Sequence, residues 1–160
     1  MLIKRFIMKA VVQRVSSSSV VIDGETVGKI DRGYNVLLGV FPDDTKKDAE
    51  ILAAKIAKLR IFEDENEKMN LSVLDIGGEV LVVSQFTLCA DIKKGNRPSF
   101  TTAAQPTYAN ELYEYFMEQL KLNGIKKVEH GSFGADMKVE INNDGPVTII
   151  MDTEIWNKGD

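Results

Sequence analysis

Short blocks of apolar residues, several of them alternating with polar residues, fill the N-terminal quarter of the chain, and this pattern is typical of β-strands. It predicts strands at residues 10–15, 19–22, 26–30 and 34–40. Asp23-Gly24 lies between the second and third of these strands, and this pair is a preferred sequence for a two-residue type I′ turn. We therefore expect a β-hairpin centred on Asp23-Gly24.

Two later segments carry apolar residues at helical spacing. The first spans roughly residues 45–60 and follows potential N-terminal caps at residues 43–45. The second begins near Pro106, a residue suited to the first turn of a helix, and ends at Asn123-Gly124, a good C-terminal cap. Both are predicted to be amphipathic helices with one buried face.

Residues 78–88 form an apolar run that becomes polar at its far end. The apolar part predicts a strand that is buried on both faces, whereas Ser84, Gln85 and Thr87 are polar but uncharged at neutral pH. Further strands are predicted at residues 128–129, 137–141 and 147–151. Many strands and two separated long helices indicate the α+β class rather than alternating βαβ units.

The composition is that of one globular domain, with 160 residues, 44% of them apolar and 28% charged. The net charge of −4 does not suggest a general nucleic-acid binder, although a local basic patch suffices for contact with an RNA end. Cys89 is the only cysteine, and no Cys/His cluster offers a metal site. We expect a cytoplasmic protein without metal, in which Cys89 is a small buried side chain rather than a nucleophile.

Groups suited to strong acid–base catalysis are scarce. His130 is the only histidine, so a Ser-His-Asp triad would require it, and Ser84 lacks the Gly-x-Ser-x-Gly turn that exposes a hydrolase nucleophile. We expect His130 to be structural. Such a site suits an activated ester better than a peptide bond, because orientation and hydrogen bonds to the developing oxyanion then suffice.

Two short motifs, Ser84-Gln85-Phe86-Thr87 and Gly145-Pro146, lie within a longer series of similar segments at residues 8–15, 90–100 and 131–137. In this order they resemble the D-aminoacyl-tRNA deacylase (D-tyrosyl-tRNA(Tyr) deacylase) family, with its Ser-Gln-Phe-Thr and Gly–cis-Pro motifs. The resemblance implies a curled, barrel-like, mostly antiparallel β-sheet with two main helices packed outside. It also implies a homodimer without cofactor.

The implied activity is hydrolysis of the ester bond of D-aminoacyl-tRNA and of mischarged glycyl-tRNA, as chiral proofreading in translation. Family members start at the equivalent of Met8. Residues 1–7 are therefore expected to be an overhang, residues 8–153 a single deacylase domain and residues 154–160 a polar C-terminal tail. The overhang is too short for a membrane span or a secretory signal, so no membrane association is expected.

Gly145-Pro146 has two interpretations. From the residues alone it is a turn before a strand, and the trans peptide is favoured. The resemblance implies the cis form, with carbonyls that project into the partner subunit's active site and exclude L-residues by collision. Glycine permits this close approach of the backbone, and proline stiffens it.

Within the first motif, the backbone N–H groups of Phe86 and Thr87 are candidate oxyanion donors. Thr87 and Gln85 are assigned to the catalytic site. The Thr87 hydroxyl is expected to position the ester or a water, because no base that would activate it as a nucleophile is evident. Ser84 is assigned to substrate binding, although Ser84 and Gln85 fit equally well as residues that satisfy the backbone at a strand end. The Phe86 ring is expected in the core rather than against adenine.

Lys93, Lys94 and Arg97 form the candidate contact with the tRNA backbone, and a merely solvated loop is equally compatible with their sequence. Two other functions remain open. One is a non-catalytic module that binds the 3′ end of aminoacyl-tRNA, and the other is a hydrolase that cleaves small esters through Ser84 or Thr87.

Overall fold

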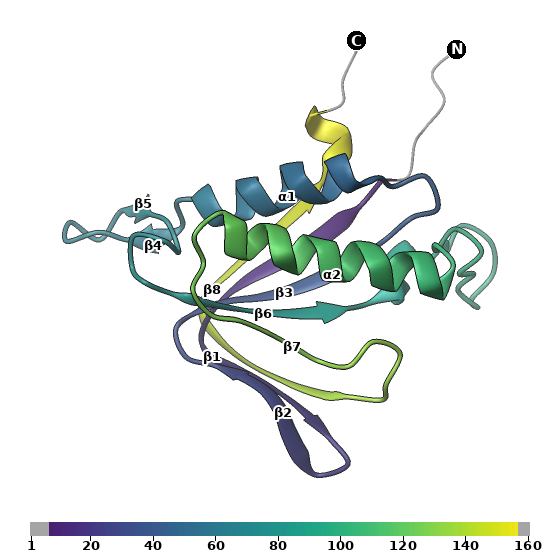
Figure 1. The fold of residues 1–160 in the computed structure, drawn as a ribbon, viewed down its shortest axis with the longest axis horizontal. Helices are drawn as coiled ribbons and strands as arrows, with labels where there is room; N and C mark the ends of the chain where they lie inside the picture. Colours follow the sequence, from purple (N-terminus) through teal and green to yellow (C-terminus); the bar gives the residue numbers. More distant parts are fainter. Residues whose placement is uncertain (1–6, 157–160) are drawn as a thin grey trace.

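In a computed structural model that describes residues 7–156, the chain forms eight strands, two α-helices and two short 3₁₀ helices (Figure 1). In chain order these are β1 (Lys9–Ile22), β2 (Glu25–Ile30), β3 (Gly33–Gly39), α1 (Lys46–Lys58), β4 (Phe62–Glu63), β5 (Met69–Leu71), β6 (Glu79–Ser84), η1 (Phe86–Cys89), α2 (Pro106–Leu122), β7 (Val128–His130), β8 (Lys138–Asp152) and η2 (Thr153–Trp156).

β1 organises the main sheet. Its first half pairs antiparallel with β3, its second half pairs antiparallel with β2, and β8 runs antiparallel along its other edge. From β3 the sheet continues through the parallel neighbours β6 and β7. The sheet curls until β2 lies against β7, so the barrel is nearly closed (Figure 1). This arrangement confirms the expected α+β fold, with a mixed sheet whose antiparallel part is the larger.

The apolar residues form two cores on opposite faces of the curled sheet. α1 and α2 pack together over one face, where their buried sides meet residues of β1, β3 and β6 (Figure 1). A smaller cluster fills the inside of the curl and consists of Val15, Val20, Ile30, Leu81 and Val83. The helices therefore cover the sheet from outside, and the smaller cluster packs its inner face.

Both predicted helices and the predicted hairpin are confirmed. α1 begins after Thr45, which forms a capping box with Asp48, and α2 has Pro106 at its start. Asp23 and Gly24 have φ angles of 49° and 81°, and the positive values are those that a type I′ turn requires.

The predicted separation of residues 10–15 from residues 19–22 is wrong, because both belong to the single strand β1. The serines between them stay extended since their hydroxyls find partners. Ser18 Oγ donates to the Glu140 carbonyl oxygen at 2.6 Å, and Asn35 Nδ2 donates to Ser18 Oγ at 2.9 Å. Side-chain hydrogen bonds thus keep a polar stretch in the sheet.

The predicted strands at residues 137–141 and 147–151 are likewise parts of one strand, β8. Pairing with β1 persists on both sides of Gly145-Pro146, with register irregularities opposite Val15. The Gly-Pro pair therefore interrupts a long strand rather than connecting two strands.

At both ends of the described chain, the folded part reaches slightly beyond the predicted domain of residues 8–153. Ile7, from the predicted overhang 1–7, is buried, and η2 carries Trp156, from the predicted tail 154–160, against the core. Residues 1–6 and 157–160 lie outside the described residues, so the proposed boundaries stay predictions. No helix within residues 7–156 is long and apolar enough to cross a membrane.

Candidate active site

A cavity of about 830 Å³ lies where three parallel strands end. β3, β6 and β7 share one direction, so the segments that leave them reach the same edge of the sheet, on the right of Figure 1. Val40 follows β3, residues 84–87 end β6 and enter η1, and residues 133–137 follow β7. The start of α2 completes the wall. The sheet topology thus gathers the first motif and two distant segments around one space.

The predicted strand at residues 78–88 ends earlier than expected, at Ser84. Its parallel neighbour β3 ends at Gly39, and the last rung of the pairing is the bond from the Gln85 N–H to the Leu38 carbonyl, at 2.8 Å. Because β3 offers no further residue for pairing, the chain leaves the sheet after Ser84 and turns into η1. A Cβ added at Gly39 would lie 2.9 Å from Leu88 Cβ, so this glycine allows η1 to pack directly on β3.

η1 presents unused donors at the cavity. The N–H groups of Phe86 and Thr87 make no hydrogen bond within residues 7–156, as is usual for the first N–H groups of a helical turn. Gln85 Nε2 donates to Thr87 Oγ1 at 3.0 Å, and both side chains line the cavity. Since the Thr87 oxygen accepts this bond, its hydroxyl hydrogen is free to donate to a ligand.

Phe86 differs from the expectation of a core residue. Its side chain is 58% exposed, lines the cavity and meets the Phe100 ring edge to face, with 5.1 Å between the centroids. The strand interpretation failed here because the turn into η1 rotates the ring out of the sheet. The two rings give the cavity an aromatic rim.

Cys89, at the end of η1, takes no part in the cavity. It is buried, its Sγ lies 3.4 Å from the Val40 carbonyl oxygen, and burial raises the pKa of the thiol to about 12. A thiol with so high a pKa is a poor nucleophile at neutral pH. The expected role as a small buried side chain is confirmed.

The predicted basic contact lies on a loop next to the aromatic rim. Backbone hydrogen bonds between Asp91 and Ser99, at 2.7 and 2.9 Å, close this loop at its base. Lys93, Lys94 and Arg97 are exposed on it and form no ion pair within the described part of the chain. Three positive charges are therefore available on the loop that directly precedes Phe100 of the aromatic rim.

Gly145-Pro146 is a cis peptide on the exposed part of β8. The buried Arg14 holds the residue before it: Arg14 Nε donates to the Asp144 carbonyl at 3.0 Å, and Nη1 donates to the Ile61 carbonyl at 2.7 Å. A Cβ added at Gly145, whose φ is 129°, would lie 3.0 Å from Arg14 Nη2. One guanidinium on β1 thus fixes this segment of β8 to the segment before β4.

The structure does not bring all predicted site residues together. Residues 84–87 line the cavity, but Gly145 and Pro146 do not. Val139, on the same strand, does line it, and the seven residue steps from Val139 to Pro146 span about 23 Å at the rise of an extended strand. Within the described part of this chain, the Gly-Pro segment is therefore remote from the cavity.

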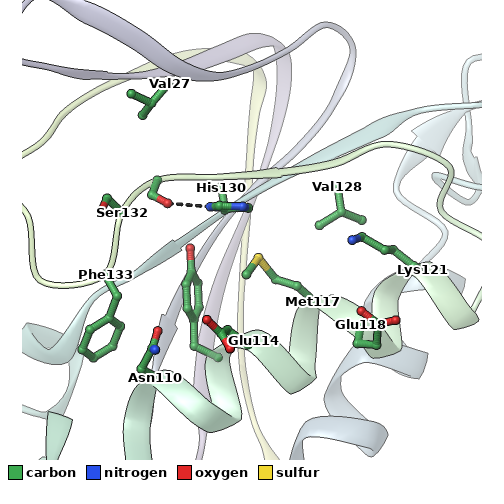
Figure 2. Close-up of a pocket in the computed structure, with 12 residues that line it drawn as sticks. Val27, Asn110, Glu114, Met117, Glu118, Lys121, Val128, His130, Ser132 and Phe133 are labelled. Atoms are coloured by element: carbon green, nitrogen blue, oxygen red, sulfur yellow. Dashed lines mark hydrogen bonds between the residues drawn. The ribbon is translucent and has the colours of Figure 1, made fainter. Parts of the chain in front are cut away.

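His130 belongs to a different cavity, of about 700 Å³, between α2, β7 and β2 (Figure 2). Its Nδ1 lies 2.6 Å from the Gly131 carbonyl oxygen, and acidic residues of α2 line the space below it. Ser84 and Thr87 are not in this lining. The single histidine thus lines a different cavity from Ser84 and Thr87, which does not support a triad through it.

Comparison with known proteins agrees with these features. The family model of D-Tyr-tRNA(Tyr) deacylase matches residues 11–152. This chain belongs to that family. A D-aminoacyl-tRNA deacylase of Koribacter versatilis (strain Ellin345) is 60% identical over 147 residues, which cover 92% of this chain and 98% of that protein.

Two solved structures share the fold of this deacylase family member. A c-Myc DNA unwinding element binding protein has a TM-score of 0.85 at 47% identity, covering 90% of this chain and 97% of that chain. A probable eukaryotic D-amino acid tRNA deacylase has a TM-score of 0.78 at 16% identity, covering 91% and 98%, and this likeness concerns the fold alone. The family resemblance inferred from the two motifs is thus confirmed.

Sequence reasoning on this deacylase family member missed the contribution of Arg14. The residue occupies a position on the helix-covered face of β1, in register with the buried Ala10 and Val12. A charged residue at an inward position of an alternating strand is a usable indication of a buried polar partner, because an unpaired charge there is costly. Its partners, from β8 and from the segment before β4, could not be identified without the topology.

Proposed function

We propose that this protein is a D-aminoacyl-tRNA deacylase that hydrolyses the ester between a D-amino acid, or a mischarged glycine, and the tRNA 3′ end. The membership of the family supports the enzyme class and the substrate. The observation that carries the proposal for the site is the pair of N–H groups, of Phe86 and Thr87, that have no partner within residues 7–156. They lie at a cavity whose described lining contains no histidine or cysteine.

The two N–H groups would bind the carbonyl oxygen of the ester, where negative charge develops as water attacks. One such donor contributes roughly 10²–10³ to the rate. The Thr87 hydroxyl, oriented by Gln85, would direct the ester or the attacking water. The water oxygen bonds to the carbonyl carbon, and the ester C–O bond then breaks with the ribose oxygen as the leaving group. The proton lost by the water passes to the ribose oxygen, with help from the neighbouring 2′-hydroxyl of the tRNA, and the amino acid is released free.

Covalent catalysis by Thr87 is not part of this proposal. A threonine nucleophile needs a base within hydrogen-bonding distance, and the Thr87 oxygen instead accepts a bond from the Gln85 amide. Trapping of an acyl group on Thr87 after rapid quenching would overturn this part of the proposal and leave the substrate assignment untouched.

Stereochemical selection is assigned to Gly145-Pro146 of a second protomer, so the active unit is a homodimer. Two observations support this. The segment is exposed and lies about 23 Å along β8 from the cavity-lining Val139 of its own chain. Within residues 7–156, β8 pairs only with β1, which leaves its other edge open. A backbone wall beside the α-carbon would collide with the side chain of an L-residue and spare that of a D-residue.

The remaining assignments concern the tRNA. Lys93, Lys94 and Arg97 would contact phosphates near the 3′ end, and Ser84 would contact the terminal nucleotide or the aminoacyl group. No organic cofactor or metal is required by this chemistry. As a proofreading enzyme of translation, the protein would act in the cytoplasm.

The deciding experiment measures release of free amino acid from D-tyrosyl-tRNA by the purified protein. Multiple turnover supports the proposal. Binding of the charged tRNA without release would instead favour the non-catalytic module. Rapid cleavage of a small ester that lacks any nucleotide would favour the simple esterase.

A further inference from the structure

The cavity beside η1 has one ionisable side chain. Its other lining groups are apolar side chains or uncharged polar ones, such as those of Gln85, Thr87 and Gln105. Asp136 is the exception. It is exposed, and within residues 7–156 it forms no ion pair that would neutralise it. The described lining therefore carries one negative charge and no positive charge, so the cavity favours a ligand with a positively charged group.

The position of Asp136 follows from the sheet. β6 and β7 are parallel neighbours, with Val82 opposite His130. The segments that follow them, η1 and residues 131–137, therefore leave the same edge and form adjoining parts of the cavity wall. Asp136 thus shares one space with the N–H groups of Phe86 and Thr87.

The substrate class named under the proposed function carries a complementary charge. An aminoacyl ester has an α-amino group one carbon away from the scissile carbonyl, and an α-amino group is largely protonated at neutral pH. A cation that enters a partly desolvated space gains most from a carboxylate there. Hydrogen bonds between charged groups are also among the stronger ones.

We infer that Asp136 binds the α-ammonium group of the aminoacyl ester and thereby makes the enzyme specific for esters with a free amino group. This inference rests on the proposed function. It also supplies what a chiral filter needs, because handedness is defined only when three directions around the α-carbon are fixed. The N–H groups of η1 fix the carbonyl, Asp136 fixes the ammonium, and the partner's backbone wall tests the third direction.

The test compares D-phenylalanyl-tRNA with its N-acetyl derivative, which lacks the positive charge. Asp136→Asn should lower kcat/KM for the free amine roughly tenfold, the loss of one charged hydrogen bond, and leave the value for the acetylated ester unchanged. Asp136→Glu should retain part of the preference. Asp31→Asn, which replaces an exposed aspartate outside the cavity, is the matched control and should change neither value.

A second measurement uses a 3′-amide analogue of D-phenylalanyl-adenosine, which cannot be hydrolysed, in its free and acetylated forms. The unaltered protein should bind the free amine more tightly, and Asp136→Asn should remove the difference. Equal losses for both forms, or no loss for either, would overturn the inference while the deacylase activity stands. Failure of the unaltered protein to release amino acid from either tRNA would overturn the proposed function as well.

Discussion

Replacing Arg14 by lysine tests how the Gly-Pro segment is held. The guanidinium of Arg14 donates to the Asp144 carbonyl at 3.0 Å and to the Ile61 carbonyl at 2.7 Å from a position that is only 6% exposed. A lysine ammonium keeps the charge but cannot span both carbonyls in the same way, because it lacks the planar fork. We expect it to retain the shorter bond to Ile61 and to release Asp144.

The magnitude follows from the bond that is lost. A hydrogen bond from a charged donor contributes about 1.5–3 kcal/mol, and water cannot easily replace it at a buried site. The free energy of unfolding should fall by that amount, which lowers Tm by roughly 4–10 °C for a domain of this size. A released Asp144 also loosens the adjacent Gly145, so the ratio of D-tyrosyl to L-tyrosyl cleavage should fall about tenfold.

The assay combines denaturant unfolding with deacylation of both enantiomers. Arg60→Lys is the control, because Arg60 is exposed and donates to the Asn70 carbonyl at 2.9 Å, away from β8. It should change the unfolding free energy by less than about 0.5 kcal/mol. If Arg14→Lys matched this control in stability and kept the full stereochemical ratio, the assigned role of Arg14 would be refuted.

Four further results are expected. Gly39→Ala places a Cβ 2.9 Å from Leu88 Cβ, so it should displace η1, destabilise the fold by about 1–3 kcal/mol and lower kcat/KM; wild-type activity would contradict the packing argument. Thr87→Ala should lower kcat up to about tenfold without abolishing it, since backbone donors remain; complete loss would contradict a positioning role. Neutralising the three basic residues of the 91–99 loop should reduce the slope of log(kcat/KM) against log[salt] by about 2, and an unchanged slope would argue against phosphate contacts. Burial raises the pKa of Asp44 to about 7, above 3.8 in the unfolded chain. The folded state therefore holds this proton more tightly, and unfolding measurements should show up to about 4 kcal/mol lost as the pH rises from 4 to 7, a slope that Asp44→Asn should remove.

Elements whose boundaries are set by residues close in the sequence could be predicted from the sequence. The capping box of Thr45 and Asp48 and the positive φ values of Asp23 and Gly24 are of this kind. The polar stretch within β1 was predicted as a break, because its support comes from Glu140 and lies more than 100 residues away.

In the candidate site, too, the local motif was predictable from the sequence, whereas the features that depend on strand pairing were not. The Ser-Gln-Phe-Thr motif was recognisable, but the end of β6 depends on where β3 ends, so neither η1 nor the exposure of Phe86 could be foreseen. The meeting of this motif with residues 133–137 depends on the parallel pairing of β6 and β7. Pairing partners are set by the whole topology, which the hydrophobic pattern does not encode.

The most direct test is a side-by-side measurement of kcat/KM for D-tyrosyl-tRNA and L-tyrosyl-tRNA prepared from the same tRNA. Selection by a backbone wall predicts efficient cleavage of the D-ester and survival of the L-ester over the same period. Comparable cleavage of both enantiomers by the unaltered protein would contradict it.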